Sequence, residues 1–116
     1  MRVRIRTEGD PISRESLGLI EETFRLSLGA RLAPDVRMLR LDLSIPSEDS
    51  PKGSARCHVQ VHLRDGEIVS FTECSENLRK AVETAAWRLE RRLRRLTDVA
   101  RGRTSNSATM GRSGNR

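Results

Sequence analysis

Two alternating segments joined by Asp65-Gly66 constrain the fold of this chain more than any other feature of the sequence. Apolar and polar residues alternate over residues 57–63, and a second alternating stretch follows at about 67–73. An Asp-Gly pair between two such stretches is a strong signal for a tight hairpin turn, and alternation gives each strand one apolar face. The segment therefore predicts a hairpin in an antiparallel sheet that is buried on one side.

Alternation also predicts two strands earlier in the chain. Val3 and Ile5 alternate with arginines over residues 2–7, and a Gly-Asp-Pro sequence at 9–11 breaks this strand. Leu39, Leu41, Leu43 and Ile45 occupy every second position over residues 38–45. We therefore expect both segments to be strands with one apolar face and one polar face.

Two further segments repeat apolar residues at spacings of three and four, which places those residues on one face of a helix. The first helix is expected to begin after Ser13, its N-cap, and to end between Gly29 and Pro34. The second is longer and is expected to open at Ser75 or Glu76. The predicted buried stripes are Leu17, Ile20, Phe24 and Leu28 in the first helix, and Leu78, Ala81, Val82, Ala85, Leu89, Leu93 and Leu96 in the second.

The predicted order of elements is β-α-β-β-β-α, which is an α+β fold. The three later strands should form an antiparallel meander, and the first strand should join the second in parallel through a right-handed crossover. Because the strands alternate, one face of the sheet stays wet and both helices must cover the other face. The sequence thus predicts a four-stranded sheet with two helices packed on one face.

The length of 116 residues accommodates one domain of this kind. We assign residues 1–99 to this α+β domain. Residues 46–54 are polar and turn-rich and are expected to form a mobile loop. Residues 100–116 lack an apolar period after Gly102 and are predicted to be a basic, disordered tail.

Positive charge is concentrated late in the chain. The net charge is +6, but residues 1–78 contain 11 Lys and Arg against 13 Asp and Glu, whereas residues 79–103 contain nine basic and three acidic residues. A localised basic stripe is typical of a polyanion-binding surface. A solvated helix face that keeps the protein soluble is the alternative, and the strength of the imbalance favours the functional interpretation.

The cations of the second helix lie along one rigid rod, where guanidinium groups can follow a folded RNA backbone and recognise its shape more than its sequence. The candidate RNA-binding residues are Arg79, Lys80, Arg88, Arg91, Arg92, Arg94 and Arg95. No DNA sequence specificity is expected. Three outward arginines of the first strand either extend this surface or protect a solvated edge strand; they are Arg2, Arg4 and Arg6.

Trp87 falls on the outward side of the second helix, among the cations. It can stack on an unpaired base, or its ring can lie over neighbouring aliphatic stems or pack against the first helix. Leu19 and Leu26 lie outside the apolar stripe of that first helix. If these two leucines and Trp87 are contiguous and exposed, a contact with a protein partner becomes the better interpretation.

Signals for catalysis, metal binding and membrane insertion are weak. His58 and His62 lie about 13 Å apart along one strand, too far to share a metal ion. Cys57 and Cys74 are an isolated pair without metal-ligand spacing and form no disulfide framework, so both are expected to be reduced thiols. There is no apolar run of about 20 residues and no secretory signal. We therefore expect a cytoplasmic protein that is not an enzyme, with no cofactor, no metal and no membrane partner.

Residues 57–95 resemble the hibernation-promoting factor family, also called the ribosome-associated inhibitor or sigma-54 modulation family. The resemblance rests on CHVQVHL, the Asp-Gly hairpin and SENLRKAVETAAWRLERRLRR, and it extends more loosely over residues 1–97. Members of the family often have a helix that opens with a sequence like N-L-Y-A-A-I-D. The matching stretch here is Asn77-Leu78-Arg79-Lys80-Ala81-Val82-Glu83. Arg79 here replaces the family's aromatic residue, and the first half has few of the usual lysines.

The resemblance implies a fold related to double-stranded-RNA-binding domains, and a short form without the extra C-terminal domain of the long forms. It also implies binding to rRNA of the small ribosomal subunit through the seven helix cations, which inhibits translation during hibernation or stress. The alternative hypothesis is a divergent member that binds a protein partner through an exposed Trp87 surface. A third is a general RNA chaperone.

Overall fold

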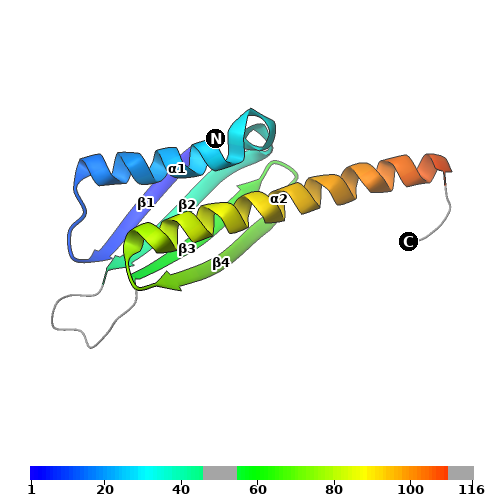
Figure 1. The fold of residues 1–116 in the computed structure, drawn as a ribbon. Helices are drawn as coiled ribbons and strands as arrows, with labels where there is room; N and C mark the ends of the chain where they lie inside the picture. Colours follow the sequence, from blue (N-terminus) through cyan, green and yellow to red (C-terminus); the bar gives the residue numbers. More distant parts are fainter. Residues whose placement is uncertain (46–54, 110–116) are drawn as a thin grey trace.

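The computed structural model describes residues 1–45 and 55–109, with side chains up to residue 98. The predicted loop at 46–54 and the last part of the predicted tail, 110–116, lie outside the described residues. The elements in chain order are β1 (Arg2–Gly9), α1 (Arg14–Leu32), the 3-10 turn η1 (Ala33–Asp35), β2 (Val36–Ile45), β3 (Ala55–Leu63), β4 (Ile68–Ser75) and α2 (Leu78–Thr109) (Figure 1).

The four strands form one sheet in the order β1-β2-β3-β4. β1 pairs with β2 in parallel, whereas β2 pairs with β3, and β3 with β4, in antiparallel register. The hairpin turn between β3 and β4 contains Gly66 at φ +97°, a conformation that glycine adopts without steric cost. The predicted meander and the predicted parallel crossover through α1 are both confirmed.

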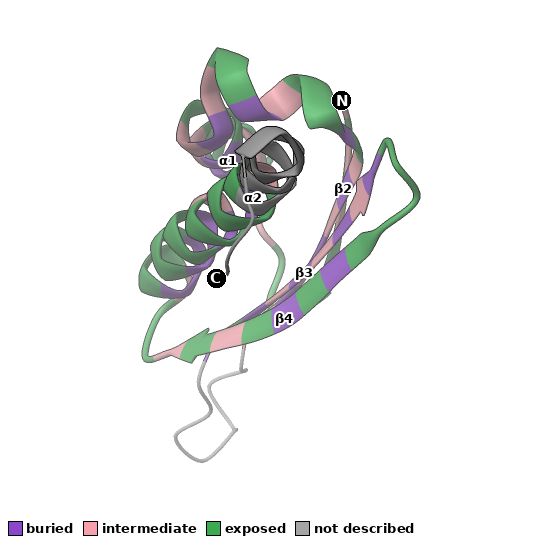
Figure 2. Ribbon diagram, turned by 90° about the vertical axis from the view of Figure 1, so that its right-hand side faces the viewer, coloured by how far each residue is buried: buried purple, intermediate pink, exposed green. Residues whose placement is uncertain are grey.

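Both helices lie on the same face of the sheet, and no described element covers the opposite face (Figure 2). α2 packs on α1 and on strands β3 and β4. The predicted α+β architecture, a four-stranded sheet with two helices on one side, is therefore confirmed. The arrangement leaves the outer sides of α1 and α2 and the open face of the sheet exposed to solvent.

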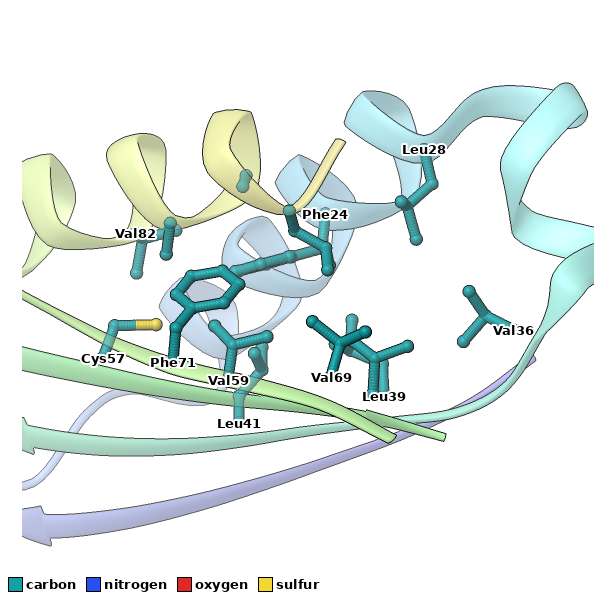
Figure 3. Close-up of a cluster of buried hydrophobic side chains, with 14 of the residues drawn as sticks. Phe24, Leu28, Val36, Leu39, Leu41, Cys57, Val59, Val69, Phe71 and Val82 are labelled. Carbon is teal, nitrogen blue, oxygen red and sulfur yellow. The ribbon is translucent and has the colours of Figure 1, made fainter. Parts of the chain in front are cut away.

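The core lies between the sheet and the helices and is entirely apolar: no polar or charged side chain is buried among the residues that the structure describes. Phe24 of α1 is fully buried, and Phe71 of β4 lies under α2 (Figure 3). Most of the inward strand residues predicted from alternation are buried, namely Leu39, Leu41, Leu43, Cys57, Val59, Val61, Leu63, Val69 and Phe71, whereas Val3, Ile5 and Ile45 are partly buried. This continuous apolar layer fixes which side of α2 faces the sheet, and thereby which side faces solvent.

The helix starts show one confirmed prediction and one error. Ser13 caps α1 as predicted, since the Ser16 N–H donates to Ser13 Oγ at 3.1 Å. The second helix was expected to open at Ser75 or Glu76, but Asn77 is the cap: the Lys80 N–H donates to Asn77 Oδ1 at 2.9 Å. β4 continues through Ser75, which pairs with Ala55, so the helix cannot begin before the strand ends.

The end of α2 differs from the prediction in two respects. Leu96 was expected in the buried stripe but is 39% exposed, because the last buried residue is Leu93 and the helix then runs past the sheet (Figure 1). The tail was expected to lack structure from residue 100, whereas the helix extends to Thr109. The segment contains no proline, and Gly102 alone costs a helix only about 1 kcal/mol, so nothing in it stops the helix sharply.

Candidate RNA-binding surface

The side of α2 that does not face the sheet consists of two flanks and, between them, a solvent-facing ridge. Its apolar side is fixed by buried residues at helical spacing, including Val82, Leu89 and Leu93. One flank faces α1, and the other lies along β4, where the guanidinium carbon of Arg88 sits 4.6 Å from the centre of the Phe71 ring. The ridge between these flanks points away from the sheet. The seven predicted RNA-binding cations lie on these three parts of the helix.

Four of the seven cations form ion pairs with carboxylates. Three pairs join residues four apart in sequence, and the fourth joins α2 to β4. They are Arg79 with Glu83 (3.3 Å), Lys80 with Glu76 (2.8 Å), Arg94 with Glu90 (2.9 Å) and Arg88 with Glu73. Exposed pairs of this kind contribute little to stability, but they do reduce the local positive potential that an RNA phosphate would meet.

The other three cations are unpaired. Within the part of the chain that the structure describes, no carboxylate oxygen lies within 4.0 Å of Arg91, Arg92 or Arg95. All three are exposed, and they lie within about 6 Å of one another along the helix axis. We call them the unpaired trio. Their guanidinium groups retain free N–H donors for bidentate contacts with phosphate.

Two aromatic rings hold members of this trio. The guanidinium carbon of Arg91 lies 4.8 Å from the centre of the Trp87 ring, and that of Arg92 lies 5.8 Å from the centre of the Phe71 ring. Cation–π contacts of this length are attractive and restrict the side chain without using its N–H donors. The aromatic residues thus orient the charges of Arg91 and Arg92 while leaving their hydrogen-bonding capacity available.

Trp87 is 56% exposed, and it does not line the groove that contains the two exposed leucines. Leu19 and Leu26 line an open groove of about 740 Å³ between α1 and the first turns of α2, and Trp87 is not among its lining residues. This groove therefore does not join the two leucines to Trp87. Trp87 is associated with Arg91, and its remaining exposed ring surface lies beside the trio.

The two histidines make hydrogen bonds on the open face of the sheet. His58 Nδ1 lies 2.7 Å from Thr72 Oγ1, and His62 Nε2 lies 3.3 Å from Gln60 Oε1. Among the described residues, no three His, Cys, Asp or Glu side chains are grouped so that they could hold a metal ion. Within the same residues, no helix is long and apolar enough to cross a membrane.

The two cysteines should differ sharply in reactivity. Burial raises the pKa of the Cys57 thiol to about 12, with smaller contributions from the nearby carboxylates of Glu73 and Asp42, whereas Cys74 is exposed. Because the thiolate is the reactive form, we expect a disulfide reagent at pH 8 to modify one thiol per native chain and two after denaturation. Cys74→Ser should abolish the native reaction. Rapid modification of both thiols in the native protein would contradict this placement.

The fold and this surface define a class: a single α+β sandwich that carries unpaired arginines on a long second helix. The family model for the sigma 54 modulation protein / S30EA ribosomal protein matches residues 19–101, and the chain belongs to this family. The family resemblance predicted from the sequence is thereby confirmed. No curated protein matches the sequence.

Two solved structures have the same fold. A ribosomal subunit interface protein from Coxiella burnetii is 18% identical, with a TM-score of 0.64 over 82% of this chain and 98% of that one. The N-terminal domain of Protein Y from Thermus thermophilus is 24% identical, with a TM-score of 0.63 over 83% of this chain and 99% of that one. At these identities the similarity establishes the fold.

Proposed function

We propose that this protein binds rRNA of the small ribosomal subunit in the cytoplasm and inhibits translation by occupying that subunit during hibernation or stress. Membership of the S30EA ribosomal protein family supports a ribosomal partner. The similar fold from Coxiella burnetii is described as a ribosomal subunit interface protein, which supports the same partner. The unpaired trio on α2 is the observation from which we assign the proposed RNA contact to specific residues.

Phosphate binding explains why this trio matters more than the other helix cations. A phosphate that approaches Arg79, Lys80 or Arg94 must compete with a carboxylate already in contact. A phosphate that approaches the trio displaces no described carboxylate, and each neutralised phosphate releases condensed counterions. The trio is therefore the strongest candidate for direct contact with the RNA backbone, and the paired cations contribute mainly to the surrounding potential.

The proposed mode of action is occupation of the subunit, which requires no chemical step. A rigid helix that projects past the sheet can enter a channel between RNA segments, and the trio lies where α2 leaves the sheet. Contacts with phosphates recognise the shape of folded RNA and carry little sequence information. Inhibition should therefore follow the number of protein molecules bound per ribosome.

Titration of the protein into a cell-free translation system tests this proposal. We expect the yield of product to fall in proportion to added protein and to reach its minimum near one protein per ribosome, because each molecule blocks one subunit. The inhibition should weaken as salt is raised. Inhibition by amounts far below the ribosome concentration would indicate a catalytic activity and contradict the proposal, as would no inhibition at a large excess.

A further inference from the structure

The open face of the sheet carries arginines of its own. Alternation along the strands directs five of them away from the core, namely Arg2, Arg4, Arg6, Arg40 and Arg56. The same alternation places only two carboxylates on this face, Glu8 and Asp42. No described element covers the face (Figure 2). It is therefore a second positively charged surface, on the opposite side of the domain from the ridge of α2.

The strand register brings like charges together on this face. Arg4 of β1 is the direct neighbour of Arg40 of β2. Like charges on adjacent strand positions destabilise a sheet, and nothing in the core requires them there. Protection of an exposed edge would explain charges on β1 but not on β2, which is an interior strand. An anion bound across both strands would relieve the repulsion between Arg4 and Arg40.

Asp42 only partly neutralises this surface. Its carboxylate oxygens lie 4.0 Å from Arg6 Nε and 3.7 Å from Arg40 Nε, too far for hydrogen bonds. Both guanidinium groups therefore keep their N–H donors, and Asp42 Oδ1 itself has no hydrogen-bond partner. Arg6 and Asp42 also line a hollow of about 280 Å³, whose other charged or titratable lining residues are Glu8, Arg56 and His58. The face thus offers unsatisfied donors around a concave region.

We propose that the open face of the sheet is a second RNA-binding surface, which contacts the phosphates of an RNA segment other than the one bound by α2. This inference rests on the proposed function and extends it: the domain sits between two RNA segments and holds both. Arginine forks match phosphate geometry, and the described strand residues of this face include two histidines but no Phe, Tyr or Trp that would stack strongly on bases. The contacts are therefore with the backbone and are independent of sequence.

A two-RNA capture experiment tests the inference directly. The full chain is bound to a biotinylated short RNA duplex on beads, the excess protein is washed away, and a fluorescent duplex of different sequence is added. The wild-type protein should retain the second duplex, and moderate salt should release it. If the wild-type protein holds the first duplex and retains none of the second, the sheet face does not bind RNA and the inference is overturned.

Charge variants assign the second duplex to the sheet. Replacing Arg2, Arg4 and Arg6 together by glutamine should leave the first duplex bound and lower capture of the second at least about tenfold. The matched control replaces three exposed arginines of α1, with the same change in charge and little expected effect: Arg14→Gln, Arg25→Gln and Arg31→Gln. Capture that survives the β1 changes, for example through association of two protein copies, overturns the inference.

Asp42→Asn is expected to increase RNA binding, a result that misfolding of the variant would not produce. Removing the carboxylate frees Arg6 and Arg40 from their partner and should increase affinity for the second duplex about threefold. An unchanged or lower affinity in the folded variant counts against the sheet face. The proposed function fails by a different result, in which loss of the unpaired trio on α2 leaves binding of the first duplex unchanged.

Discussion

Replacing Arg91, Arg92 and Arg95 together by glutamine is expected to weaken binding to the small ribosomal subunit by about a hundredfold or more. The estimate assumes one charge-assisted phosphate contact for each guanidinium, worth roughly 1–1.5 kcal/mol after competition with water and salt. All three side chains are exposed, so the fold should survive the change. Fluorescence anisotropy of labelled protein, titrated with subunits at several salt concentrations, measures the loss.

A matched variant of the same helix separates contact from general charge. This variant replaces Arg79, Lys80 and Arg94 by glutamine. It removes the same number of positive charges as the trio variant, but its three side chains already contact carboxylates. We expect the trio variant to lower the slope of log affinity against log salt by about two to three, and the paired variant to change it by less than about one. Equal changes for the two variants would show that the division into paired and unpaired cations has no bearing on binding.

Phe24→Ala should cost about 3–5 kcal/mol of unfolding free energy, which is a large part of the total stability of a small domain. Phe24 is fully buried between α1, α2 and the sheet, so its removal leaves a cavity where all three meet (Figure 3). Urea denaturation followed by the fluorescence of Trp87 measures the change.

Leu26→Ala is the control, because Leu26 lies two residues further along the same helix but is 74% exposed. Its loss should change the unfolding free energy by less than about 0.5 kcal/mol. Similar losses for the two variants would contradict the described packing of α1, since only one of these side chains belongs to the core.

The topology was predictable because each strand has one apolar face and the Asp65-Gly66 turn fixes one hairpin. The ends of the helices and strands were harder to predict from the sequence, since they depend on tertiary contacts. β1 continues two residues beyond Thr7 because it pairs with the end of β2, as far as Gly9 with Ile45. Helical periodicity placed Leu96 in the buried stripe, but periodicity does not say where the sheet beneath the helix ends.

The sequence predicted that the candidate surface lies on the second helix, but it did not show which of the cations form ion pairs and which are unpaired. The spacing of four between Glu76 and Lys80, or between Glu90 and Arg94, is visible in the sequence and could have indicated those ion pairs. The pair between Arg88 and Glu73 joins residues 15 apart and depends on how α2 crosses β4. The positions of Arg40 and Arg56 on the open face could have been inferred from strand alternation, but their proximity to β1 required the register.

Sedimentation of the purified protein with separated ribosomal subunits through a sucrose gradient, at about 50 and about 200 mM salt, tests the central claim most directly. We predict that the protein travels with the small subunit at low salt, is released as salt rises, and remains near the top at both salts when the unpaired trio is replaced by glutamine. A wild-type protein that remains at the top at low salt would contradict the account, as would a folded trio variant that still travels with the small subunit.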